Sequence, residues 1–335
     1  MTPAGWRPGW RGLALILLAG ATALIMQGYV GSRTIYAPEV AAKRDSAHSF
    51  ILQNQLPAGA TWNDYGLKGA RARILIVATA DRLHKLVGAP VQKIYFWIDT
   101  LALAAGLIAL FFLLRTWAPP GLALSGMLYV AAVLPLTYAL HYFHPWDRVS
   151  LLIWVILLAL LRKGKLVLFA AVLVMGMLVK YDVILLPALY FLASYRNGPA
   201  RAAMTTAALF LLTVGVYLIL IRVFGEGVGQ RSVATQVATN LEDFRSLLIW
   251  YPPLLALGVP AGLALLGFGT ADHFARAAAV FAILMSVPLF LFSNFVEIRA
   301  EMPVLILLLP AALSGLARLI GPAGQPGDRG AAVAA

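Results

Sequence analysis

The sequence contains no cysteine among its 335 residues. Disulfide bonds, thiol nucleophiles and cysteine-based zinc sites are therefore excluded. Charged residues are also scarce, because only 12% of the chain is Asp, Glu, Lys or Arg whereas 61% is hydrophobic. Soluble domains carry about 25% charged residues. The composition therefore predicts a polytopic integral membrane protein.

Several motifs of soluble enzymes are missing as well. The chain has no Gly-rich phosphate-binding loop, no Gly-x-Ser-x-Gly nucleophile elbow and no His-Glu-x-x-His motif, which disfavours ATP-driven and nucleotide-sugar enzymes. The formal net charge is +12, but the basic residues are scattered between hydrophobic runs and form no basic domain. We therefore expect no nucleic-acid partner, and we expect contact with the lipid bilayer.

Long apolar runs dominate what is present. A helix needs about 20 apolar residues to cross a bilayer, and fewer where the membrane is locally thin. We predict an all-α polytopic membrane protein with one domain over residues 1–320 and a disordered, Gly-, Pro- and Ala-rich cytoplasmic tail over 321–335. About ten transmembrane helices are expected near residues 13–31, 95–114, 120–141, 148–161, 165–179, 183–195, 202–224, 247–268, 277–295 and 302–320.

Topology follows from the charges of the connections, since Lys and Arg in short loops stay cytoplasmic. Alternate connections carry eleven basic and only two acidic residues. This predicts that both termini are cytoplasmic. The first span is expected to be an uncleaved signal-anchor, because its apolar stretch runs on to about Val30 and no convincing cleavage box follows. Nearly every carboxylate then faces the outer surface.

The long first loop, from about 32 to 94, lies on that outer side. Its stretch "LKGARARILIVATADRLHKLVG" has charged and apolar residues at roughly helical spacing, as expected of an interfacial helix. Arg71 and Arg73 belong to this stretch, and Asp64 and Glu39 are carboxylates of the same loop. The alternative to a catalytic role is that each of these carboxylates is an ordinary solvated loop residue.

Two short outer stretches combine opposite charges. In "HPWDRVS", Asp147 precedes the fourth span and can cap that helix, border a substrate site, or do both. His141 and His144 have one-turn spacing, but no clear third ligand accompanies them. In "VKYDVILLP", Lys180 and Asp182 sit between two apolar runs. If this stretch were helical, the intervening Tyr181 would rotate Asp182 by about 100° away from the position directly after Lys180. A tight turn with a snorkelling lysine is the alternative to a phosphate-binding role.

The stretch "NFVEIRAEMP" opens the last span with Glu297, Arg299 and Glu301. A solvated turn with an internal ion pair is one interpretation. The other is a phosphate- or pyrophosphate-binding arginine whose guanidinium is fixed by Glu297.

The order of these parts resembles that of polyprenyl-phosphate-dependent glycosyltransferases of the GT-C membrane fold. The resemblance covers much of the chain: a first span, a long outer loop and then many spans with short connections. Its motifs are an arginine that opens an apolar helix late in the first loop ("ARARILIVATADRL"), an aspartate that starts the fourth span ("HPWDRVSLLIWV"), "VKYDVILLP", and the Glu-x-Arg of "VEIRAEMP".

The resemblance implies a protein of the bacterial inner membrane that transfers a sugar from a polyprenyl phosphate or pyrophosphate carrier to an acceptor on the outer, periplasmic face. The acceptor would be a glycan, a lipid or a protein. The reaction would belong to cell-surface glycan assembly, with other assembly proteins as possible partners. Such a reaction needs cations that hold the phosphate and a carboxylate that deprotonates the acceptor. Whether the reaction requires a divalent metal is left open, and no residues are assigned as metal ligands. The assigned residues are Asp64 and Glu39 as catalytic bases; Arg73, Arg71, Lys180 and Arg299 as phosphate ligands; and Asp147, Asp182, Glu297 and His144 as residues that border the site.

Two rival functions remain open at this point. The first is a lipid or polysaccharide transporter or flippase, although the sequence shows no strong internal repeat of the kind found in many transporters. The second is a non-catalytic member that binds polyprenyl lipid within a glycan-synthesis complex.

Overall fold

The computed structural model describes residues 10–53, 73–138, 144–224, 233–243, 245, 251–294 and 297–320. Within these ranges every regular element is a helix, and no strand occurs. The all-α prediction is therefore confirmed. The tail over 321–335 lies outside the described residues.

Six helical stretches are long and apolar enough to cross a membrane, which supports a multi-pass membrane protein. The first, over Gly12–Arg33, consists of α1 (Trp10–Ile25) and two short continuations. The others are α5 (Val91–Leu114), α6 with its 3₁₀ continuation (Pro120–Val133 and Leu134–Tyr138), α10 (Pro199–Phe224), α14 (His273–Phe292) and α15 (Ile298–Ile320).

The other four predicted spans coincide with shorter helices. These are α7 (Asp147–Arg162), α8 (Leu166–Val179), α9 (Leu186–Ser194) and α13 (Val259–Gly267), the last preceded by helical residues from Tyr251. A helix of 14 residues, such as α8, is about 21 Å long, which is less than the roughly 30 Å of a bilayer's hydrocarbon core. Helix length and composition therefore support six candidate spans, and the predicted ten remain a proposal.

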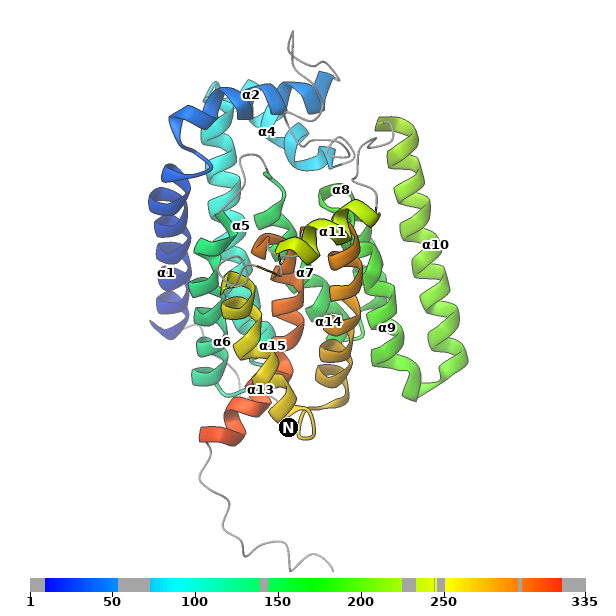
Figure 1. Cartoon of the computed structure of the whole chain (residues 1–335). Helices are drawn as coiled ribbons and strands as arrows, with labels where there is room; N and C mark the ends of the chain where they lie inside the picture. Colours follow the sequence, from blue (N-terminus) through cyan, green and yellow to red (C-terminus); the bar gives the residue numbers. More distant parts are fainter. Residues whose placement is uncertain are drawn as a thin grey trace, which may run out of the picture.

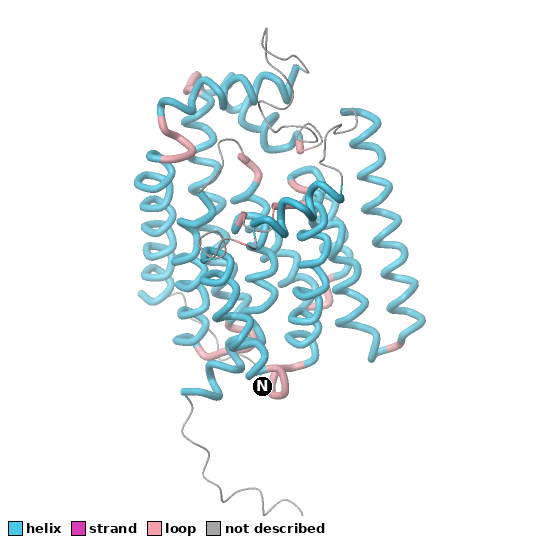
Figure 2. Tube along the Cα trace, in the orientation of Figure 1, coloured by secondary structure: helices cyan, strands magenta, loops and turns pink. Residues whose placement is uncertain are grey.

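Two helices of the first loop lie across one end of the bundle. They are α2 (Pro38–Gln53) and α4 (Ile74–Val87), and both run over the ends of the long helices (Figures 1 and 2). Gly88, with a φ of 71°, ends α4 in the left-handed conformation that favours glycine. Buried Ile76, Val77 and Ala80 hold α4 against the bundle. A third helix, α11 (Val233–Asp243), also runs across the bundle rather than along it (Figure 1).

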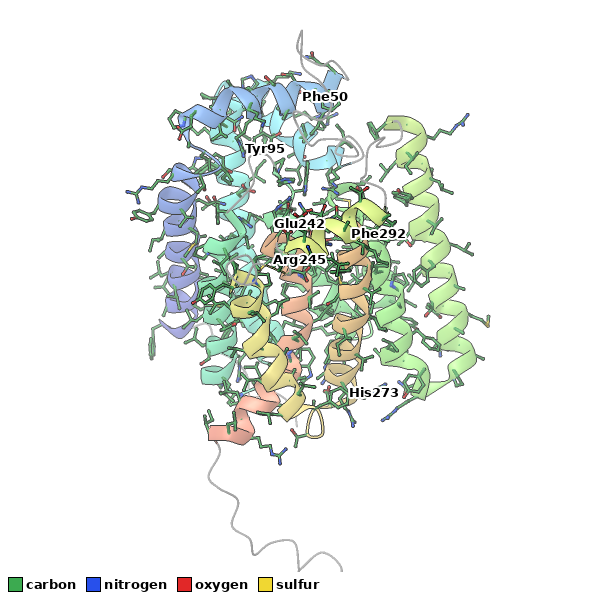
Figure 3. All side chains as sticks on the ribbon, viewed as in Figure 1. Phe50, Tyr95, Glu242, Arg245, His273 and Phe292 are labelled. Atoms are coloured by element: carbon green, nitrogen blue, oxygen red, sulfur yellow. The ribbon has the colours of Figure 1, made fainter. Side chains whose placement is uncertain are left out.

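The predicted basic connections meet at the opposite end of the bundle (Figure 1). His273, at the start of α14, marks this end in Figure 3. The turns there join α5 to α6, α7 to α8, α9 to α10 and α13 to α14. Basic residues in or beside these turns and at the end of α15 are Arg115, Arg162, Lys163, Lys165, Arg196, Arg201, Arg276 and Arg318.

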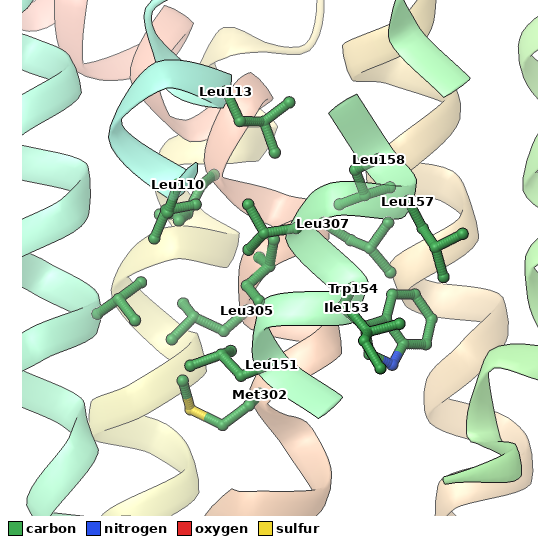
Figure 4. Close-up of a cluster of buried hydrophobic side chains, with 14 of the residues drawn as sticks. Leu110, Leu113, Leu151, Ile153, Trp154, Leu157, Leu158, Met302, Leu305 and Leu307 are labelled. Atoms are coloured by element: carbon green, nitrogen blue, oxygen red, sulfur yellow. The ribbon is translucent and has the colours of Figure 1, made fainter. Parts of the chain in front are cut away.

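The core is centred on α15, whose residues from Met302 to Leu313 are all buried. Gly267 of α13 and Gly315 of α15 meet at their backbones, because a Cβ on either glycine would collide with backbone atoms of the other helix. Small residues allow this close approach. Figure 4 shows part of the core, where α5, α7 and α15 contribute Leu110, Leu113, Leu151, Trp154, Met302, Leu305 and Leu307.

Candidate functional site

Charged side chains from four separate parts of the chain converge at the end of the bundle that α2 and α4 cover. We call this group the buried charge cluster. Its members are Arg73, which precedes α4; Asp147, the first residue of α7; Lys180 and Asp182, between α8 and α9; and Glu297, Arg299 and Glu301, at the start of α15.

Asp147 links two cations of the cluster. One carboxylate oxygen lies 3.3 Å from Lys180 Nζ and the other lies 3.6 Å from Arg299 Nη1. Asp182 adds a second contact to Lys180 at 3.5 Å, and Glu297 forms an ion pair with Arg299. These side chains are only 6–16% exposed. Buried charges are expensive unless paired, so this part of the cluster is held together by mutual neutralisation.

The local backbone explains how Lys180 and Asp182 face each other. Helix α8 ends at Val179, and Lys180 is extended, with φ −161° and ψ 119°. A 3₁₀ segment, Tyr181–Leu185, then carries Asp182. The helical offset of about 100° therefore does not apply, because the two residues do not share a helix. The Asp147 cap is also absent: Trp146 occupies the N-cap position of α7 without a side-chain cap bond, and Asp147 follows it in the first turn.

Arg73 occupies a different setting from the other two cations. Its guanidinium carbon lies 4.9 Å from the ring centre of Trp146 and 4.6 Å from that of Tyr181, which is the range of cation–π attraction. Burial opposes its charge, but Tyr181, Asp147 and Asp182 outweigh that effect, so the pKa of Arg73 is raised and it stays charged. Among the described residues, no carboxylate forms an ion pair with Arg73.

Helix α11 fixes the position of Arg299 through a chain of amides. Gln236 Nε2 donates to Asn294 Oδ1 at 2.9 Å, and Asn294 Nδ2 donates to Glu297 Oε1 at 2.8 Å. Asn240, one turn after Gln236, donates to the carbonyl of Phe290 at 2.6 Å. The sequence interpretation missed these amides. Their only signal was the pair of amide residues at i and i+4 in a short amphipathic segment.

Neither carboxyl oxygen of Glu301 has a hydrogen-bond partner or an ion-pair partner within the described part of the chain. Its side chain is entirely buried, and Lys180 is the charged group that acts on it most strongly. A buried carboxyl group without a partner costs stability. Such groups in membrane spans commonly mark functional sites. The sequence interpretation noted Glu301 but did not assign it to the site.

A second layer of buried polar residues lies beside the cluster. The guanidinium of Arg148 lies 4.3 Å from the ring centre of Tyr138. Asp99 of α5 accepts a hydrogen bond of 2.6 Å from the hydroxyl of Tyr36. Both Arg148 and Asp99 are buried, so the polar region extends from the cluster toward the start of α2.

The other assigned residues separate into three groups. Glu39 is exposed in the first turn of α2, and no contact within the described ranges joins it to the cluster. Asp64 and Arg71 lie outside the described residues. The ring of His144 packs edge-on against Trp146 beside the cluster. Where the chain is described, no three His, Asp or Glu side chains are grouped as metal ligands.

Comparison of this chain with protein-family models, with curated proteins and with solved structures finds no match. The residues of the chain therefore carry the functional argument by themselves.

Proposed function

We propose that this protein is a GT-C-like membrane glycosyltransferase that moves a sugar from a polyprenyl-phosphate donor to an acceptor on the outer, periplasmic face of a bacterial inner membrane. The proposal includes ten membrane crossings, with the basic connections and both termini on the cytoplasmic side. The observation that carries it is the buried charge cluster, which brings Arg73, Lys180 and Arg299 together at the opposite end of the bundle from those connections.

The cluster suits a phosphate because its three cations differ in what they already contact. Asp147 positions Lys180 and Arg299 in a fixed arrangement, which lowers the cost of ordering them around a ligand. Arg73 has no carboxylate in an ion pair within the described ranges and is held by aromatic faces. Its charge is therefore available to an incoming phosphate oxygen. Positive charge at this point stabilises the phosphate as it leaves the sugar.

The acceptor hydroxyl also needs a base. Asp64 and Glu39 of the first loop are the proposed bases, and Glu301 joins them because it is a carboxyl group at the cluster with no hydrogen-bond partner among the described residues. In the reaction, the base takes the hydroxyl proton while the acceptor oxygen bonds to the anomeric carbon. The bond from that carbon to the donor's phosphate oxygen breaks, and the phosphate departs with the electron pair.

The proposal is tested by incubating the full-length protein in nanodiscs with polyprenyl-phosphate sugars and membrane-extracted acceptors, and measuring labelled sugar in the product. We expect transfer by the wild type and at least a 100-fold loss in Lys180→Met, because the phosphate loses a positioned cation. Lys163→Met, an exposed lysine at the opposite end, is the matched control and should retain transfer. Asp64→Asn and Glu39→Gln distinguish the two first-loop bases. Equal transfer by Lys180→Met and the wild type would refute the role of the cluster.

A transporter or flippase is the second candidate function, and two buried carboxyl groups favour it. Asp99 on α5 and Glu301 on α15 are both buried within long apolar helices, a placement typical of proton relays in transporters. Flux of a lipid-linked sugar across proteoliposomes, without transfer, would support this candidate. Donor binding with neither flux nor transfer would instead favour a non-catalytic lipid-binding member of a glycan-synthesis complex.

A further inference from the structure

A second polar site lies between α2, α4 and the start of α5. It is a pocket of about 470 Å³, a volume within the range of small-molecule sites. Tyr95 and Phe50, which Figure 3 labels, mark this end of the molecule. The polar lining residues on which the argument depends are Asp45, His48, Asp81, His84, Lys85 and Gln92.

One wall of the pocket is fixed by Gln92. Its amide nitrogen donates to Asp45 Oδ1 at 2.7 Å, while its amide oxygen accepts from Arg44 Nε at 2.7 Å. Arg44 is itself buried. Asp45 is therefore held through one oxygen, and its other oxygen is the one available to a ligand.

The opposite wall is fixed in the same manner by contacts within α4 and its C-terminal turn. Lys85 Nζ lies 2.7 Å from Asp81 Oδ2, and His84 Nδ1 lies 2.7 Å from the carbonyl oxygen of Ala89. A carbonyl oxygen only accepts, so Nδ1 carries the proton and Nε2 of a neutral His84 is an acceptor. Positioned polar groups of this kind reduce the ordering cost of binding.

His48 provides the most specific feature of the pocket. Only 7% of the residue is exposed, and its Nδ1 lies 2.7 Å from the hydroxyl of Tyr95. Its Nε2 lies 3.9 Å from Asp81 Oδ1, which is too far for a hydrogen bond. A ligand hydroxyl between them can accept from Nε2–H and donate to the carboxylate, with Tyr95 donating to Nδ1.

The charge of the lining selects the ligand class. Two carboxylates, Asp45 and Asp81, face one lysine, Lys85. Burial, more than the opposing effect of Asp81 and Asp45, lowers the pKa of His48, so this ring is neutral at pH 7. Carboxylates therefore outnumber cations among the lining side chains, and Arg44 lies behind Gln92 rather than on the lining. This lining disfavours phosphate and suits groups that both donate and accept hydrogen bonds.

We propose that this pocket binds a neutral, hydroxyl-rich saccharide. Its further identification as the acceptor glycan depends on the proposed glycosyltransferase function. Asp81 of α4 lies eight positions after Arg73, which occupies the N-cap position of that helix, a distance of about 12 Å along a helix. An acceptor of two or three sugars can therefore occupy the pocket while its end approaches the buried charge cluster.

The proposal is tested by saturation-transfer NMR on the full-length protein in nanodiscs, without donor. The probes are maltose, lactose, chitobiose and maltotriose, together with maltose 1-phosphate as the anionic comparison. We expect at least one neutral sugar to bind and the phosphorylated sugar to bind at least tenfold more weakly. Asp81→Asn should weaken the neutral sugar about tenfold. Ser49→Trp, at an exposed lining position, should block binding without removing a buried partner.

The controls separate this proposal from the proposed reaction. Glu242→Gln removes an exposed carboxylate on α11, and Lys180→Met removes a cation of the charge cluster; both should keep saccharide binding. No signal from any neutral probe, preference for the phosphorylated sugar, or unchanged binding in both Asp81→Asn and Ser49→Trp would overturn the proposal. Saccharide binding without any sugar transfer would leave the pocket intact and refute only the glycosyltransferase.

Discussion

The two ends of the helix bundle each hold a cluster of ion pairs, and the two clusters differ in burial and in completeness. At the basic end, Arg162 contacts Asp272 at 2.6 Å, and these side chains are 31% and 38% exposed. Asp272 also accepts from Trp117 Nε1 at 3.1 Å and from the backbone N–H of Ala275 at 2.8 Å, which caps α14. Both of its carboxylate oxygens are therefore satisfied.

At the other end, the buried charge cluster is largely shielded from solvent but incomplete. Glu301 has no hydrogen-bond partner in the described ranges, and neither do the buried Nε atoms of Arg73 and Arg299. Natural proteins keep few buried polar groups unsatisfied. The carboxylate of Asp272, which joins helices at the basic end, has both of its oxygens satisfied. Ionisable groups perturbed by burial and by neighbouring charges commonly gather at functional sites, so this difference supports the ligand-binding role proposed for the buried cluster.

The largest expected effect comes from breaking the centre of the buried cluster. Asp147→Asn removes the charge that Lys180 and Arg299 share, and leaving a buried cation poorly paired costs about 3 kcal/mol of unfolding free energy. Thermal and denaturant unfolding in detergent measure this loss, and sugar transfer should fall with it. A loss of stability no larger than that of Asp272→Asn would show that the two clusters do not differ as described.

An opposite change in stability is expected at Glu301. Glu301→Met replaces a buried carboxyl group, which has no hydrogen-bond partner among the described residues, by an apolar side chain of similar length. We expect the unfolding free energy to rise by about 1–3 kcal/mol, the cost of an unsatisfied buried group. If Glu301 takes the acceptor's proton, transfer falls at least 100-fold in this more stable variant. Unchanged transfer removes Glu301 from the mechanism, and reduced stability would show that the carboxyl group has a partner.

The smallest effect is expected at the basic end. Asp272→Asn keeps a side-chain oxygen that can cap α14 but loses the charge that pairs with Arg162. Because that pair is partly exposed, the variant should lose less than about 1 kcal/mol of stability and retain full sugar transfer. The same unfolding and transfer assays apply. A loss comparable to that of Asp147→Asn would contradict the contrast between the two ends.

Part of the candidate site was predictable because its signals are local. Hydropathy places Asp147, Lys180 and Arg299 at the ends of apolar runs, and alternation of the connections assigns these positions to one end of the bundle. Arg73 was assigned through the family resemblance, in which an arginine opens an apolar helix late in the first loop. Hydropathy and loop charge do not depend on which helices are neighbours, so both can be evaluated from the sequence alone.

Other parts of the site depend on contacts between distant segments. Gln236 and Asn294 are 58 residues apart, and nothing near either one predicts their hydrogen bond. Lys180 reaches both Asp147 and Asp182 because α8 ends at Val179 and Lys180 is extended, and the sequence did not indicate which backbone conformation joins the two apolar runs. The saccharide pocket likewise requires α2 and α4 to lie side by side.

The sequence by itself determined that this protein is a helical membrane protein. Long apolar segments with few charged residues are stable only in lipid or in a buried core. It also separated the basic connections from most carboxylates. Only the tertiary structure decided which charges meet, which carboxyl group lacks a partner among the described residues, and that Asp147 joins two cations. The physical reason is that hydropathy is a sum over neighbours in the chain, whereas pairing and burial are set by neighbours in space.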